Sequence, residues 1–80
     1  MPAHSVTIYS TPTCIYCKLA KQFFFENKIS FKEIDVAEDS QAAQRMIKIS
    51  GQSGVPVIEV DGKIVVGFDK PALKKYLQLK

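Results

Sequence analysis

The feature that most constrains the fold is an Asp-Gly dipeptide, Asp61-Gly62, which lies between two β-rich runs late in the chain. These runs read VPVIEV and KIVVGF, and both contain many β-branched residues. Asp-Gly favours the tight two-residue turn whose twist matches a pair of antiparallel strands. The sequence therefore predicts a β-hairpin over residues 55–68.

The first part of the chain alternates between strand and helix patterns. VTIY at residues 6–9 is short, β-branched and aromatic, which predicts a strand, and STPT then interrupts it. From residue 15, apolar residues recur at helical spacing until about Asn27, and ISFKEIDV at residues 29–36 fits a second strand. The apolar side predicted for this helix consists of Ile15, Leu19, Phe23 and Phe24, with Phe25 off the stripe.

Two more helices complete the predicted order. AEDSQAAQRMIKISG at residues 37–51 has acidic residues and Ser40 at its start and Gly51 just past its end, which are ordinary helix boundaries. Asp69 is suited to cap a last helix that has Pro71 in its first turn. The apolar residues expected to face the core are Ala42, Met46 and Ile49 in the earlier helix and Leu73, Tyr76 and Leu77 in the last.

Strand, helix, strand, helix, hairpin and helix follow one another in a chain of 80 residues. A strand-helix-strand opening favours a right-handed crossover between parallel strands, and the hairpin adds antiparallel strands to the same sheet. Near-continuous apolar strands are buried by helices on both faces of a sheet. We therefore expect one monomeric α/β domain over residues 1–80, with a mixed four-stranded sheet.

Composition and charge exclude several classes of protein. Hydrophobic residues make up 46% of the chain and charged residues 24%, as in ordinary globular proteins. The net charge of +3 comes from scattered lysines, with no basic run longer than Lys74-Lys75, so we expect no nucleic-acid surface. No signal peptide or membrane-spanning run is visible, and we expect a cytoplasmic protein without membrane contact. In that compartment a permanent disulfide is not expected.

Two cysteines, Cys14 and Cys17, are the chain's most reactive side chains. Cys14 lies where the predicted strand-terminal loop enters the first helix, and the free N–H groups there favour a thiolate over a thiol. Cys17 follows one helical turn later, within reach for a disulfide and with more burial expected. The spacing predicts that Cys14 attacks a substrate sulfur and that Cys17 resolves the mixed disulfide.

Two other interpretations of the cysteines are open. A Cys-X-X-Cys pair is half of a tetrahedral zinc site, but the other candidate ligand is a single His4, which we expect at a mobile terminus. We therefore expect no metal. Two inert core cysteines are the second alternative, because free cysteine is often buried.

Val55-Pro56 is the second feature of interest, because proline opens a predicted strand there. An ordinary trans bond at a strand start is one interpretation. The other is a cis bond, which leaves the backbone of Val55 free to pair with an extended substrate near Cys14. The residues alone leave both possibilities open.

TPTCIYC, GVPV and GFDKP, in this order and at these separations, resemble the glutaredoxin family of the thioredoxin fold. The resemblance covers nearly the whole chain and implies a dithiol thiol-disulfide oxidoreductase with a cis Pro56. It also implies that protein disulfides or glutathione mixed disulfides are the substrates and that no cofactor is bound. The residues it assigns to the substrate or glutathione groove are Thr11, Tyr16, Gln52, Val55, Pro56, Gly67, Phe68 and Asp69.

Three positions depart from the common pattern of the resembled family. Thr11 occupies a position that often carries lysine, Ile15 replaces the proline of Cys-Pro-Tyr-Cys, and Lys70 occupies a position that is often polar or acidic. GFDKP is also similar to the Gly-Phe-X-Pro stretch of redoxins that reduce ribonucleotide reductase and are recharged by thioredoxin reductase. Glutathione and thioredoxin reductase are therefore alternative electron sources. A glutathione-dependent iron–sulfur cluster shared by two protomers is a further alternative.

Overall fold

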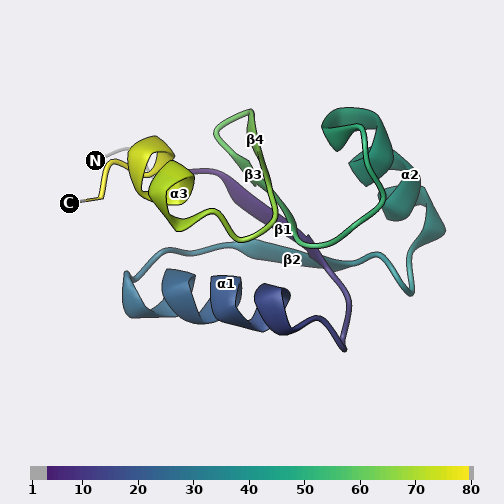
Figure 1. The fold of residues 1–80 in the computed structure, drawn as a ribbon, viewed down its shortest axis with the longest axis horizontal. Coiled ribbons are helices and arrows are strands. Elements are labelled where there is room, and N and C mark those ends of the chain that lie inside the picture. Colours follow the sequence, from purple (N-terminus) through teal and green to yellow (C-terminus); the bar gives the residue numbers. More distant parts are fainter. Residues whose placement is uncertain (1–3, 80) are drawn as a thin grey trace.

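A mixed four-stranded sheet forms the centre of the molecule in the computed structural model, which describes residues 4–79 (Figure 1). The strand order is β2-β1-β3-β4, with β1 parallel to β2 and antiparallel to β3, and with β3 and β4 paired as a hairpin. The expected mixed sheet is confirmed. In chain order the elements are β1 (Val6–Ser10), α1 (Ile15–Glu26), β2 (Lys32–Asp35), α2 (Ser40–Ser50), β3 (Val57–Val60), β4 (Lys63–Val66) and α3 (Lys70–Tyr76).

The hairpin turns at Asp61 and Gly62, as the dipeptide predicted. Both residues have positive φ angles, 50° and 85°, which is the backbone that a tight two-residue hairpin turn requires. His4 was expected at a mobile terminus, and this expectation is wrong: its Nδ1 contacts the Asp61 carboxylate. The N–H of Ser5 also donates to Asp61, at 2.7 Å, so the turn holds the start of β1.

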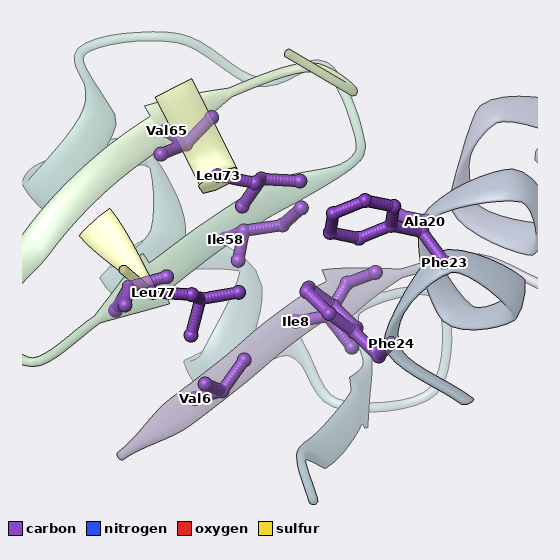
Figure 2. Close-up of a cluster of buried hydrophobic side chains, with 10 residues drawn as sticks. Val6, Ile8, Ala20, Phe23, Phe24, Ile58, Val65, Leu73 and Leu77 are labelled. Carbon is purple, nitrogen blue, oxygen red and sulfur yellow. The ribbon is translucent and has the colours of Figure 1, made fainter. Parts of the chain in front are cut away.

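Helices cover both faces of the sheet, because alternate residues of β1 point to opposite sides. Val6 and Ile8 point to the face that α1 and α3 cover, where they join a buried apolar cluster (Figure 2). Tyr9 points to the other face and packs against Met46 of α2 and Val57. The remaining members of the first cluster are Ala20, Phe23, Phe24, Ile58, Val60, Val65, Leu73 and Leu77.

The apolar side predicted for α1 is wrong in its first half. Ile15 is 71% exposed and Leu19 is 41% exposed, whereas Cys17 and Ala20 are fully buried together with the two expected phenylalanines. The buried side of α1 is therefore rotated from the predicted stripe, toward Cys17 and Ala20. The stripes predicted for α2 and α3 do face the two clusters.

Two elements are shorter than the sequence predicted, for identifiable reasons. Residues 29–31, predicted as part of the second strand, do not pair with β1. The N–H of Ile29 instead donates to the C=O of Phe24 at 2.8 Å and closes the C-terminal end of α1. Helix α2 begins at residue 40 rather than 37, because Asp39 is its N-cap and accepts from the Ala42 N–H at 3.0 Å.

Candidate functional site

Three loops meet at one end of the sheet, and the strand register explains why. Tyr9 near the end of β1 faces Val57 at the start of β3, and Val57 in turn faces Val66 at the end of β4. The loops at residues 11–14, 51–56 and 67–69 therefore leave the sheet at the same end. The N–H of Gly67 donates to the C=O of Pro56 at 2.8 Å and joins two of these loops.

Cys14 is the N-cap residue of α1. Its backbone is extended, and its Sγ accepts a hydrogen bond from the N–H of Cys17 at an N···S distance of 3.1 Å. A sulfur in this position takes the place of the usual capping oxygen, and it receives the partial positive charge of the helix N-terminus. The side chain is partly exposed, so a substrate sulfur has access to it.

Cys17 is fully buried, one helical turn beyond Cys14. Burial raises the pKa of the Cys17 thiol to about 12, and the hydrogen bond with Cys14 contributes in the same direction. A backbone hydrogen bond with Thr11 and the charge of Lys21 act in the opposite direction. Both cysteines are free thiols, so the structure corresponds to the reduced pair.

The Val55-Pro56 bond is cis, as the resemblance implied. Pro56 is buried, while the side chain of Val55 packs against the cluster that contains Met46. Among residues 4–79, neither the N–H nor the C=O of Val55 takes part in a backbone hydrogen bond. The Val55 backbone is therefore available to an extended partner.

Phe68 and Asp69 lie after Gly67, which has a φ of 78°. Phe68, which the resemblance assigned to the substrate groove, is half-buried against Phe23, with ring centroids 6.0 Å apart and in edge-to-face geometry. The Asp69 carboxylate caps α3 by accepting from the Ala72 N–H at 3.2 Å.

The other predicted site residues are spread around these loops. Tyr16 is 64% exposed on the first turn of α1. Gln52 donates to the C=O of Gly54 at 3.1 Å and so shapes the loop before the cis bond. Thr11 lines a hollow of about 350 Å³, and Phe68 lines a second hollow of about 200 Å³ beside α1.

Sequence reasoning missed a polar cluster beside the first hollow. Strand β1 itself has no carboxylate, but the neighbouring strand β2 supplies Glu33. Glu33 Oε2 accepts from Ser10 Oγ at 2.8 Å and from Lys21 Nζ at 2.7 Å. The hydrogen bond from Lys21, then that from Ser10, lowers the pKa of Glu33 below its ordinary value. One sequence signal pointed toward this cluster: Lys21 follows Cys17 by four residues, so both side chains lie on the same side of the helix.

Within the part of the chain that the structure describes, no three histidine, cysteine or acidic side chains are grouped so that they could hold a metal ion. Likewise, none of the helices in residues 4–79 has the length and apolar character needed to cross a bilayer.

The fold and the paired thiols define a small redoxin of the thioredoxin fold. The family model described as Glutaredoxin matches residues 6–65, and the chain belongs to the glutaredoxin family. The chain is 44% identical over 73 residues to an uncharacterised glutaredoxin-like 8.6 kDa protein in the rubredoxin operon of Clostridium pasteurianum, covering 91% of this chain and 97% of that one.

Two further comparisons place the chain within this family. It is 34% identical over 70 residues to the glutaredoxin-like protein NrdH of Lactococcus lactis subsp. cremoris, covering 88% of this chain and 96% of that one. The crystal structure of the thioredoxin-like protein BC3987 superimposes with a TM-score of 0.85 at 29% identity, covering 91% of this chain and 100% of that one. These relatives support a thiol-disulfide redox function.

Proposed function

We propose that the protein reduces disulfides through a two-cysteine exchange cycle. The Cys14 thiolate attacks a substrate disulfide, one substrate thiolate leaves, and a mixed disulfide forms on Cys14. Cys17 then loses its proton and attacks the Cys14 sulfur, which releases the second substrate thiolate and leaves a Cys14–Cys17 disulfide. Two electrons pass to the substrate, and an external reductant restores the dithiol.

The observation that carries this proposal is the contrast between the two sulfurs. Cys14 is partly exposed and accepts an N–H hydrogen bond at the start of α1, while Cys17 is fully buried one turn away. Its exposure lets a substrate sulfur reach Cys14, and burial restrains the second thiol until the first has reacted. The free backbone of Val55 is suited to hold an extended peptide or glutathione beside them.

The test replaces each sulfur separately. Cys14→Ser should abolish reduction of a protein disulfide, because the attacking sulfur is gone. Cys17→Ser should retain the attack and accumulate a stable mixed disulfide, which mass spectrometry of the intact protein detects. Turnover of protein disulfides by Cys14→Ser at the wild-type rate would refute the cycle. A brown protein containing iron and sulfide would support the cluster-binding alternative instead.

A second candidate is a redoxin recharged by thioredoxin reductase, and Thr11 is the observation that favours it. A threonine hydroxyl cannot form the ion pair that lysine forms with a carboxylate of glutathione. The 34% identity to a protein named NrdH is in keeping with this candidate. The discriminating experiment compares reduction of the oxidised protein by glutathione with reduction by thioredoxin reductase and NADPH. Faster reduction by the enzyme favours the second candidate.

A further inference from the structure

Lys21 belongs to a polar cluster and lies on the same helix as the buried Cys17. It lies four residues after Cys17 in α1, so the two side chains are on the same side of the helix. Its ammonium group is 2.7 Å from Glu33 Oε2, and this oxygen also accepts from Ser10 Oγ at 2.8 Å. Because Ser10 is 1% exposed at the end of the inner strand β1, the cluster is attached at one end to a buried residue of the sheet.

The hollow beside this cluster extends to Thr11 and Pro12, in the loop that precedes Cys14 and α1. Its volume is about 350 Å³, and it is open and polar enough to hold water. Thr11, whose backbone lowers the pKa of Cys17, is part of its wall. The complete lining is Ser10, Thr11, Pro12, Lys21, Glu33 and Asp35.

Ionisation of the Cys17 thiol requires a group that stabilises the thiolate. Burial opposes ionisation of the thiol, yet the thiolate is the form that attacks a mixed disulfide. The charged or titratable groups around it are Cys14 and Lys21 from α1 and, across the hollow, Glu33 and Asp35 from β2. Lys21 is the positive group in this set, and a nearby cation favours a thiolate.

We propose that Lys21 is a positioning residue for the resolving step: its ammonium group, oriented by Glu33 and Ser10, stabilises the Cys17 thiolate. This inference rests on the proposed dithiol cycle. Cys17 gives its proton to solvent, its thiolate attacks Cys14 Sγ, and the Cys14–Cys17 bond forms. The bond from Cys14 to the substrate sulfur breaks, and the leaving thiolate keeps the electron pair and takes a proton from solvent.

The experiment separates the two steps of one turnover. The reduced protein is mixed with dipyridyl disulfide, a neutral probe that releases one absorbing thiopyridone when Cys14 attacks and a second when Cys17 resolves. In Lys21→Gln, loss of the cation should raise the Cys17 pKa; each tenfold fall in the thiolate fraction is offset by an about threefold rise in nucleophilicity, which leaves an about threefold loss of rate. The second phase should therefore slow at neutral pH, and its rate–pH curve should move to higher pH, with the first phase unchanged.

Two matched variants control for charge and structure. Lys21→Arg keeps a cation that can pair with Glu33 and should restore the second phase. Lys48→Gln removes the same charge from an exposed position on α2 and should behave as the wild type.

Different outcomes would overturn the two proposals. Equal second phases and equal rate–pH curves in the wild type and Lys21→Gln would overturn the role of Lys21 alone. A wild-type protein with no second phase, or a second phase that persists in Cys17→Ser, would overturn the dithiol cycle itself.

Discussion

At the residue scale, the surroundings of Cys14 and Cys17 differ more than their short separation suggests. The N-cap position holds the first sulfur at the surface, and one turn of helix carries the second beneath it. The geometry of the helix thus gives two residues of the same type different environments, one accessible to a substrate and one buried. Thr11 bears on both, since its C=O accepts from the Cys14 N–H at 3.3 Å and its backbone lowers the pKa of Cys17.

Thr11→Lys should increase reduction of the oxidised protein by glutathione. The added ammonium group can pair with a glutathione carboxylate, and an exposed ion pair of this kind corresponds to a rise of about two- to fivefold in rate at low glutathione. The measurement is the rate of reduction by glutathione relative to that by thioredoxin reductase. Thr13→Lys adds the same charge to an exposed neighbour and is the matched control. An equal rise in both variants would show a general effect of charge.

The cysteines were identifiable from the sequence because their spacing is local, whereas the cis form of Pro56 was expected only from the resemblance to the family. Cys14 at the helix start and the buried Cys17 follow from three residues of one helical turn. The partners of Glu33 were not identifiable, since they come from β1 and α1 and meet only when parallel strands align Ile8 with Glu33. Side-chain contacts across elements depend on register, which no local pattern encodes.

At the element scale, α1 has one face in the core and one in solvent, and the consecutive residues Phe24 and Phe25 lie on opposite faces. Phe24 is fully buried, in contact with Phe23 at 6.0 Å and with Phe31 at 5.3 Å between ring centroids. Phe25 is 83% exposed. Helical spacing alone is compatible with several choices of the buried side of α1. In the folded protein, the side that contains Ala20 packs into the cluster around Ile8.

Phe24→Ala should lower the free energy of unfolding by about 3–5 kcal/mol, because it leaves a cavity in the cluster around Ile8. Phe25→Ala makes the same chemical change one residue later and should cost less than about 0.5 kcal/mol. Urea titrations followed by far-UV circular dichroism measure both values. Similar losses in the two variants would contradict the assigned faces of α1.

At the scale of the whole molecule, two surface carboxylates join segments that are far apart in the sequence. Glu33 connects β2 to α1, and Asp61 connects the hairpin to the start of β1. The bond with His4, then that with the Ser5 N–H, lowers the pKa of Asp61 from its ordinary 3.8. The pKa of Glu33 is lowered from 4.5. These carboxylates make the fold sensitive to acid.

Stability should fall as the pH falls through the range of these two groups. Above their ordinary values both carboxylates are charged in the folded and unfolded chains, and their full contribution is present. Below those values the unfolded chain binds protons more readily than the folded one, so unfolding is favoured. Urea midpoints between about pH 6 and about pH 3 measure the fall, and Asp61→Asn should show a smaller one. Identical curves for Asp61→Asn and the wild type would refute the contribution of Asp61.

The strand order β2-β1-β3-β4 also has a consequence for synthesis on the ribosome. The central strand is made first, but its antiparallel neighbour begins at Val57, so the sheet cannot close until most of the chain has been translated. Both cysteines therefore leave the ribosome long before residues 51–56 and 67–69, which form the other two loops of the site. Because this sequence contains two cysteines, a disulfide formed early within the chain joins the pair that the finished site uses, and premature oxidation leaves no incorrect partner to exchange.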